Sequence, residues 1–121
     1  MIRPSCPALV VHDDDAFRKS LIATLDQHHF TVTFTTDGDG AIELLAQRKF
    51  LVVIVALNLQ TGKGARTLEH LREQNGRDFA VILLGDPDPR LRTYAPWANE
   101  TLLKPVDPAY VAKRARAYCS V

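Results

Sequence analysis

The sequence predicts an α/β fold in which helices cover both faces of one parallel sheet, and three observations support this. Short apolar segments alternate with segments of helical character along the 121 residues. Most of these apolar segments lack the alternation of polar and apolar residues that marks a half-exposed strand, so we expect them to be buried on both faces. Polar or glycine residues follow several of them, at the edge where such sheets place their binding sites.

The predicted strands are short runs bounded by charged residues, proline or glycine. The second is rich in β-branched residues, which favour strands. The third is apolar throughout and is bounded too tightly to form a helix. The five predicted strands cover residues 8–12, 31–35, 51–56, 79–84 and 101–103.

A helix is predicted after each strand, and the first and last helices carry clear start signals. Asp14 or Asp15 can cap the first helix with a side-chain oxygen. Asp107 is placed to cap the last, and Pro108 suits its first turn.

The three middle helices are less regular. The second opens at the DGDG segment, residues 37–40, and the third ends near Asn75, which a glycine follows. The fourth falls within residues 85–100, where three prolines leave room for only a short helix. With right-handed crossovers, this order of elements gives a flavodoxin-like (βα)5 three-layer sandwich with a doubly wound, five-stranded parallel sheet.

Composition argues against two classes of function. The net charge is +1, so bulk electrostatics provides no attraction to nucleic acid. The longest apolar stretch, residues 50–57, is far shorter than the roughly 20 residues of a membrane-spanning helix. We therefore expect a domain that binds neither nucleic acid nor membrane, and we place it in the cytoplasm.

Cys6 and Cys119 lie near opposite ends of the chain, without a metal-binding or redox-motif spacing. In a reducing cytosol the favoured interpretation is two free thiols. The predicted fold brings the start of the first strand and the end of the last helix to one side, so a disulfide is also geometrically open.

The carboxyl ends of the strands gather the chemically interesting residues at one edge. Residues 12–15 follow the first strand, Ala56 ends the third, Gly85 follows the fourth and Lys104 the fifth. No arrangement for nucleophilic catalysis and no glycine-rich phosphate loop is present, so we do not expect an enzyme.

The chain resembles the receiver domain of two-component response regulators. The resemblance runs from about residue 8 to 118 and identifies residues 1–121 as one receiver-like domain, either complete or part of a longer protein. Five stretches carry it in order: LVVHDDDAFR (9–18), TDGDGAIELL (36–45), LNLQTGKG (57–64), AVILLG (80–85) and LLKPVD (102–107).

The resemblance implies a phosphorylation site that this chain only partly keeps. In the family, two acids after the first strand help to hold magnesium, and an aspartate at the end of the third accepts a phosphoryl group. His12 stands in place of the first acid and Asp13 keeps the second. Ala56 stands at the acceptor position and Gly85 at a position that carries a hydroxyl, whereas Lys104 is kept.

These replacements predict a degenerate pocket formed by His12, Asp13, Asp14, Ala56, Asn58, Gly85 and Lys104. Only Asp13 and the backbone carbonyl of Asn58 remain of the magnesium ligands, and neutral imidazole is a poor ligand for that ion. We therefore expect no metal and no other cofactor, with Asp13 a vestigial ligand. We expect Lys104 to form a salt bridge with Asp13, Asp14 or Asp86, and His12 to be a hydrogen-bonded core histidine.

In the family, partners bind the face formed by the fourth helix, fifth strand and fifth helix. On that face Trp97 is either an exposed anchor or a lid over the core, and Thr101 replaces an aromatic switch residue. Lys113 and Arg114 form a solvated face or a surface for an acidic partner. We expect a phosphorylation-independent pseudo-receiver that binds protein partners; the alternative is a sensor of a small ligand, anion or metal in the emptied pocket. The partner and the oligomeric state are not predicted.

Overall fold

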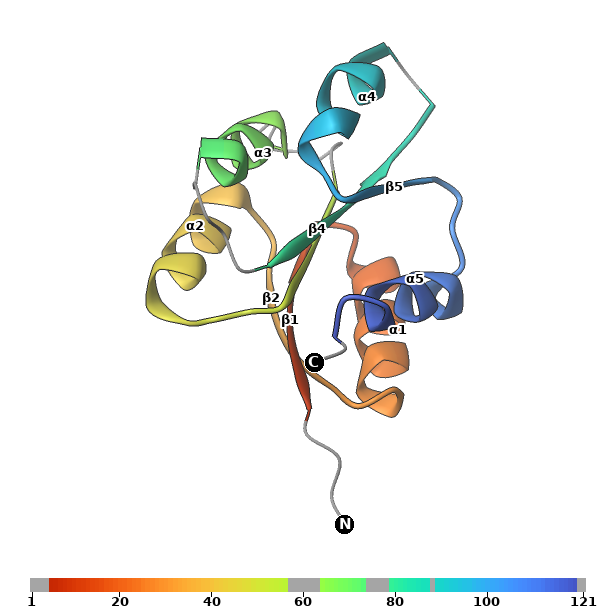
Figure 1. Cartoon of the computed structure of the whole chain (residues 1–121). Helices are drawn as coiled ribbons and strands as arrows, with labels where there is room; N and C mark the ends of the chain where they lie inside the picture. Colours follow the sequence, from red (N-terminus) through yellow and green to blue (C-terminus); the bar gives the residue numbers. More distant parts are fainter. Residues whose placement is uncertain (1–4, 57–63, 74–78, 88, 120–121) are drawn as a thin grey trace.

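The computed structural model describes residues 5–56, 64–73, 79–87 and 89–119, and Figure 1 shows how its elements are arranged. Strands and helices alternate from the first element to the last, as the sequence predicts. The strands are β1 (Cys6–Val11), β2 (Phe30–Thr35), β3 (Val52–Ala56), β4 (Ala80–Gly85) and β5 (Glu100–Leu103). The helices are α1 (Asp15–Gln27), α2 (Gly38–Gln47), α3 (Gly64–Glu73), α4 (Pro89–Tyr94) and α5 (Pro108–Arg116), with a 3-10 turn at Ala95–Trp97.

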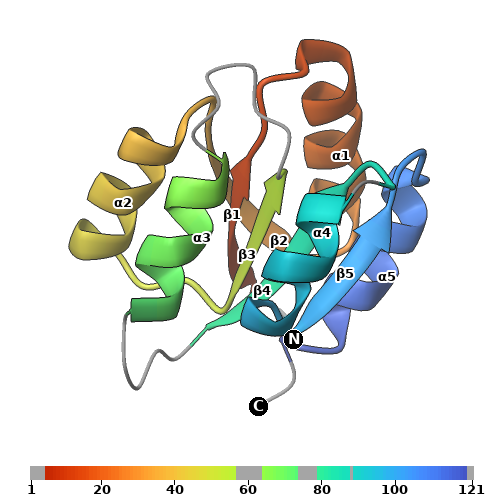
Figure 2. The same cartoon turned by 90° about the horizontal axis from the view of Figure 1, so that it is seen from above.

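The five strands form one parallel sheet in the order β2-β1-β3-β4-β5. Helices α1 and α5 cover one face, whereas α2, α3 and α4 cover the other (Figures 1 and 2). Each face has its own apolar cluster, and β1, β3 and β4 contribute to both. The predicted doubly wound, flavodoxin-like fold is therefore confirmed.

Side-chain caps fix where the helices begin. At α1 the carboxylate of Asp14 accepts a hydrogen bond from the backbone N–H of Phe17, at 2.9 Å. At α5 Asp107 accepts one from the backbone N–H of Ala109, also at 2.9 Å. Both caps agree with the sequence prediction, which left Asp14 and Asp15 open at α1.

The entry into α2 requires a glycine. Asp37 caps this helix through the backbone N–H of Gly40, at 2.7 Å, which draws the first turn against the end of β2. A Cβ atom at Gly40 would overlap Oγ1 of Thr35. The DGDG segment thus supplies both the cap and the close approach of helix to strand.

The predicted start of β1 needs correction. The strand begins at Cys6 rather than at residue 8, because the backbone N–H of Cys6 donates to the carbonyl of His29 at 2.9 Å. Pro7 has no N–H, but its carbonyl accepts from Leu51 at 2.9 Å, so it does not interrupt the strand.

Cys6 and Cys119 form a disulfide, which overturns the favoured interpretation of two free thiols. Cys6 lies in the core between the sheet and the α1–α5 layer, and Cys119, just after α5, packs against the same apolar cluster. The two Cα atoms are 5.8 Å apart, within the range that a disulfide spans.

The predicted end of α3 near Asn75 lies outside the described residues. Within the part of the chain that the structure describes, no helix is long and apolar enough to cross a membrane.

Candidate functional site

The carboxyl ends of four strands form the edge of the sheet that the sequence singled out. Val11 pairs with Val55, so His12 and Ala56, the residues that follow them, lie at neighbouring positions. Ala56 is opposite Leu84, the residue before Gly85. Gly85 in turn pairs with Leu103, which precedes Lys104. Six of the seven predicted pocket residues lie at this edge, whereas Asn58 lies outside the described residues.

Three of the predicted residues, His12, Asp14 and Lys104, line a cavity of about 330 Å³, which we call the edge cavity. The other residues that line it are Phe17, Asp86, Pro105 and Val106. The sequence analysis did not mark Phe17, Pro105 or Val106 as pocket residues. Helix α1 and the chain after β4 and β5 thus contribute to the cavity together.

His12 is almost completely buried, with 3% of its surface exposed. Its Nδ1 accepts a hydrogen bond from the backbone N–H of Asp14 at 3.1 Å, which places the ring proton on Nε2. Nε2 has no hydrogen-bond partner among the described residues. The ring lies beside Phe17, with 5.1 Å between the ring centroids. His12 is thus a core histidine with one of its two nitrogens bonded.

The surroundings of His12 favour its neutral form. Burial lowers the pKa of His12, and the positive charge of Lys104 lowers it further. The carboxylates of Asp13 and Asp14 act in the opposite direction and do not outweigh these effects.

The predicted salt bridge of Lys104 is not formed within the described residues. Lys104 is half-buried and shares the edge cavity with Asp14 and Asp86. The ion pairs among the described residues join Asp15 to Arg18 and Lys19, and Glu100 to Arg114, whereas Nδ1 of the neutral His12 lies 4.0 Å from Oδ1 of Asp13. Asp14 is instead directed to the first turn of α1, where it caps the helix.

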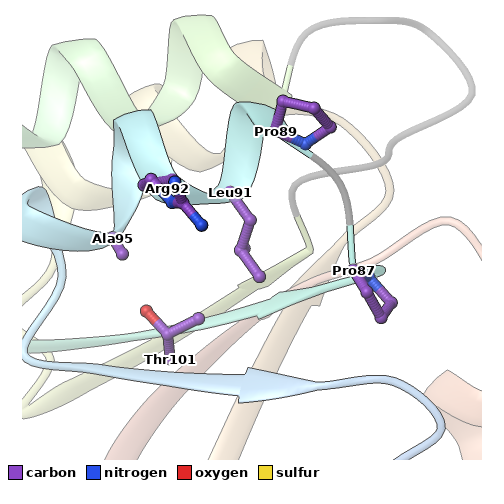
Figure 3. Close-up of a pocket in the computed structure, with 6 residues that line it drawn as sticks. All are labelled: Pro87, Pro89, Leu91, Arg92, Ala95 and Thr101. Atoms are coloured by element: carbon purple, nitrogen blue, oxygen red, sulfur yellow. The ribbon is translucent and has the colours of Figure 1, made fainter.

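A second cavity of about 620 Å³ lies between α4 and β5, and we call it the α4–β5 groove. Figure 3 shows Leu91, Arg92 and Ala95 above Thr101, with Pro87 and Pro89 at one end. The predicted surface residue Thr101 therefore lies within a hollow of mainly apolar character.

Trp97 is better described as a lid than as an exposed anchor. It is half-buried in the 3-10 turn and packs against the apolar cluster under α4. Its ring meets Tyr94 edge to face, with 5.1 Å between the ring centroids. This contact closes the end of the short fourth helix over the core.

The predicted surface residues on α5 differ from each other. Lys113 is exposed, whereas Nε of Arg114 donates to Glu100 of β5. The hydroxyl of Tyr118 donates to the other oxygen of Glu100 at 2.9 Å. The hydrogen bond and charge of Glu100 raise the pKa of Arg114. Glu100 thus links β5 to α5. Arg114, one of the two basic residues predicted for a partner surface, is therefore already paired within the domain.

Two exposed apolar residues, one on β5 and one on α5, were not predicted. Leu103 is 54% exposed and Tyr110 is 49% exposed. Leu102 packs into the core with Val111, and successive strand residues face opposite sides, so Leu103 faces the α4 side of the sheet.

Comparison with known proteins identifies the class of protein that this fold and edge define. The response regulator receiver domain family matches residues 8–116, so the chain belongs to this family. Transcriptional regulatory protein SrrA of Staphylococcus aureus is 26% identical over 112 residues, which cover 90% of this chain and 46% of SrrA. The chain thus spans less than half the length of this relative.

Solved receiver structures share the fold. The chemotaxis response regulator CheY4 of Vibrio cholerae superposes with a TM-score of 0.81 at 23% identity, covering 94% of this chain and 98% of CheY4. The signal receiver domain of an HD domain-containing protein from Pseudomonas fluorescens Pf-5 gives a TM-score of 0.82 at 27% identity, with 94% of both chains covered.

Proposed function

We propose that this receiver domain is a phosphorylation-independent module that binds protein partners in a two-component-type pathway. One observation carries the proposal: Ala56, with none of its surface exposed, ends β3, where the sequence resemblance places the family's phosphoacceptor aspartate. A buried methyl group has no atom that can accept a phosphoryl group.

The donor set at the edge supports the proposal, because it does not fit magnesium. Mg²⁺ requires oxygen ligands in near-octahedral geometry. His12 offers nitrogen only, and its Nδ1 is already bonded to the backbone N–H of Asp14. Asp13 is then the one carboxylate of the family's three at its expected position. No step of this proposal involves a metal or a catalytic reaction.

The experiment is a phosphorylation trial read by NMR. The isotopically labelled domain is incubated with magnesium and either acetyl phosphate or beryllofluoride, and amide shifts are compared with the untreated sample. We expect no saturable shift at the edge and no gain of a phosphoryl group by mass spectrometry. A receiver that has the acceptor aspartate, treated in parallel, shows that the reagents are active. Saturable shifts around Ala56, Gly85 and Lys104 would contradict the proposal.

A second candidate function is a sensor that binds a small anion in the edge cavity. The buried Nε2 of His12 lacks a partner among the described residues, and Lys104 forms no ion pair with them. Asp14 and Asp86 also line the cavity and oppose an anion. Thermal denaturation with inorganic phosphate, nucleotides or divalent metals tests this candidate, because a ligand of the folded state raises the melting temperature. The variant Lys104→Met should abolish any increase caused by an anion.

The proposal retains the cytoplasmic location that the sequence favoured, and it assigns no nucleic acid binding to this domain. Lasting disulfides are rare in the cytoplasm, so the Cys6–Cys119 pair provides the deciding measurement. Thiols are alkylated in intact cells before lysis, and the two cysteines are then examined by mass spectrometry. In a cytoplasmic domain the reducing environment should keep this pair reduced although the geometry allows the disulfide, so both cysteines should be alkylated; a fully oxidised population would contradict this location.

A further inference from the structure

We infer that two copies of this chain pair through the outer edge of β2, with the two strands antiparallel about a two-fold axis at Val32. The inference goes beyond the proposed function, because it depends neither on phosphorylation nor on the partner that the module binds. Strand β2 lies at one end of the sheet and β5 at the other. None of the described residues that line the edge cavity or the α4–β5 groove belongs to β2.

The outer edge of β2 is unprotected against pairing with another chain. Within the part of the chain that the structure describes, only β1 pairs with this strand. Its six residues, FTVTFT, include no charged residue, no proline and no glycine. Edge strands of soluble proteins are usually very short or carry charges that prevent such pairing. The other edge strand, β5, has both features, because it has four residues and begins at Glu100.

The backbone of β2 presents hydrogen-bonding groups at this edge. The N–H of Cys6 donates to the carbonyl of His29 at 2.9 Å, and the N–H of His12 donates to the carbonyl of Thr35 at 3.2 Å. Backbone groups alternate between the two sides of a strand, so the odd-numbered residues of β2 face β1 and the even-numbered residues face outward. The outward N–H and C=O groups, to which no described strand bonds, are those of Phe30, Val32 and Phe34.

The sequence of β2 favours a second copy of the chain as the occupant of this edge. Residues 30–34 read FTVTF, which is the same in both directions. In an antiparallel pair centred on Val32, this residue faces its own copy, and Phe30 faces Phe34 of the second copy. Each pair joins residues whose backbone groups point outward, so each pair exchanges two hydrogen bonds. The strand thus meets itself, as a two-fold interface requires.

The pairing also covers Phe34, which is 50% exposed in the single chain. The guanidinium of Arg18 lies over one face of its ring, with 4.9 Å between Cζ and the ring centroid. Phe34 faces the same side of the sheet as Phe30 and Val32, which pack in the apolar cluster under α1 and α5. In the dimer it lies at the seam between the copies, and aromatic side chains placed opposite each other stabilise antiparallel strands.

The charges at the two ends of β2 suit the antiparallel direction. His28 and His29 are exposed just before the strand, whereas Asp37 and Asp39 follow it. An antiparallel pair brings the histidines of each copy toward the aspartates of the other, so basic side chains meet acidic ones. The net charge of +1 adds little repulsion between two copies.

The first measurement is analytical ultracentrifugation of the intact chain over a range of concentrations, where we expect a monomer–dimer equilibrium. Val32→Lys sets two positive charges against each other at the two-fold axis and should weaken dimerisation about tenfold or more. Val32→Thr keeps a neutral β-branched side chain, and Thr93→Lys adds the same charge on the exposed surface of α4. Both controls should leave the dissociation constant close to that of the natural sequence. Melting curves verify that each variant is folded.

Amide hydrogen exchange followed by NMR locates the interface on the natural sequence. The outward N–H groups of Phe30, Val32 and Phe34 should be protected in the dimer and exchange rapidly after dilution to the monomer. The N–H groups of the odd-numbered residues of β2 bond to β1 in both states and should stay protected. This measurement needs no variant, so it tests the inference even if Val32→Lys does not fold.

A cross-link tests the register of the two strands. Residues in a hydrogen-bonded antiparallel pair have Cα atoms about 5.5 Å apart, which a disulfide spans. Oxidation of the variant Val32→Cys should therefore give a covalent dimer, whereas Thr93→Cys on α4 should not. Cys6 and Cys119 are joined to each other and do not compete for the introduced thiol.

Three results would overturn the inference. The chain could remain monomeric at millimolar concentration, which would leave the edge for a strand of another protein. A dimer could form whose outward β2 amides stay unprotected, or one that Val32→Lys leaves intact. Cross-linking through Thr93→Cys instead of Val32→Cys would place the interface at the other end of the sheet. The phosphorylation trial does not depend on any of these results, so the proposed function stands or fails separately.

Discussion

At the scale of single residues, His12 should make the stability of the domain depend on pH. Its folded-state pKa lies below the ordinary value of about 6.5, because of burial and then Lys104, with a smaller contribution from Arg18. The carboxylates of Asp13 and Asp14 oppose this shift. Below pH about 6.5 the unfolded chain binds the proton more readily than the folded domain, so the free energy of unfolding falls as the pH decreases.

The variant His12→Asn removes this titration and retains an oxygen that can accept the N–H of Asp14. We expect urea unfolding of the variant to depend less steeply on pH than that of the natural sequence between pH about 7 and 5. Equal pH dependence of the two proteins would show that His12 does not keep its neutral form on folding.

The sequence predicts which residues lie at the edge of the sheet, but it does not predict which of them form ion pairs. Parallel strands bring their carboxyl ends to one side, so the neighbouring positions of His12, Ala56 and Gly85 follow from the order of the strands. The predicted ion pair of Lys104 is absent among the described residues because pairing depends on side-chain direction. The side chain of Asp14 points to the start of α1, where it caps the helix instead of pairing with Lys104. The sequence also predicted this capping role.

At the scale of elements, the cap of α1 should contribute measurably to stability. Asp14→Ala removes the acceptor of the Phe17 N–H and should lower the free energy of unfolding by about 1 kcal/mol. Asp26→Ala is the control, because Asp26 is an exposed residue near the other end of the same helix. Chemical denaturation of both variants provides the comparison, and an equal effect of the two would argue against the cap.

The junction of β2 and α2 gives a second prediction at this scale. Gly40→Ala places a Cβ atom against Oγ1 of Thr35 and should cost about 1–3 kcal/mol, as overpacking does. In the background of Thr35→Ala the same change should cost less, because the obstructing oxygen is gone. A double-mutant cycle by urea unfolding measures this coupling, and strict additivity would contradict it.

The shortness of α4 could be predicted, whereas the groove beside it could not. Three prolines limit the helix through local backbone geometry, which a sequence displays directly. The exposure of Leu103 depends on two segments that are distant along the chain, since Gly85 of the neighbouring strand leaves it uncovered. The exposure of Leu103 can therefore be seen only when the register between β4 and β5 is known.

At the scale of the whole molecule, the fold was predictable because its signals repeat along the chain. The apolar runs of β3 and β4 are buried on both sides, and this pattern alone requires helices on two faces. The sequence contains no comparable repeated signal for the disulfide. The order of elements brought Cys6 and Cys119 to one side, but their contact depends on how the chain turns back after α5.

The last prediction concerns this disulfide, which joins residues 113 positions apart and so encloses nearly the whole domain. A closed loop of this length restricts the unfolded chain, and its removal should lower the free energy of unfolding by roughly 2–5 kcal/mol. We expect the oxidised protein to unfold at a lower urea concentration once a reductant is added. Unfolding curves with and without reductant measure the difference.

The double variant Cys6→Ala, Cys119→Ala provides the control, because it should be insensitive to reductant and close in stability to the reduced protein. Cys6 is buried in the core, so the variant also loses some packing there and should be slightly the less stable of the two. If reductant left the unfolding curve of the natural sequence unchanged although both thiols became free, the disulfide would not constrain the unfolded chain as proposed. The stability of the domain would then depend on the packing of its two faces alone.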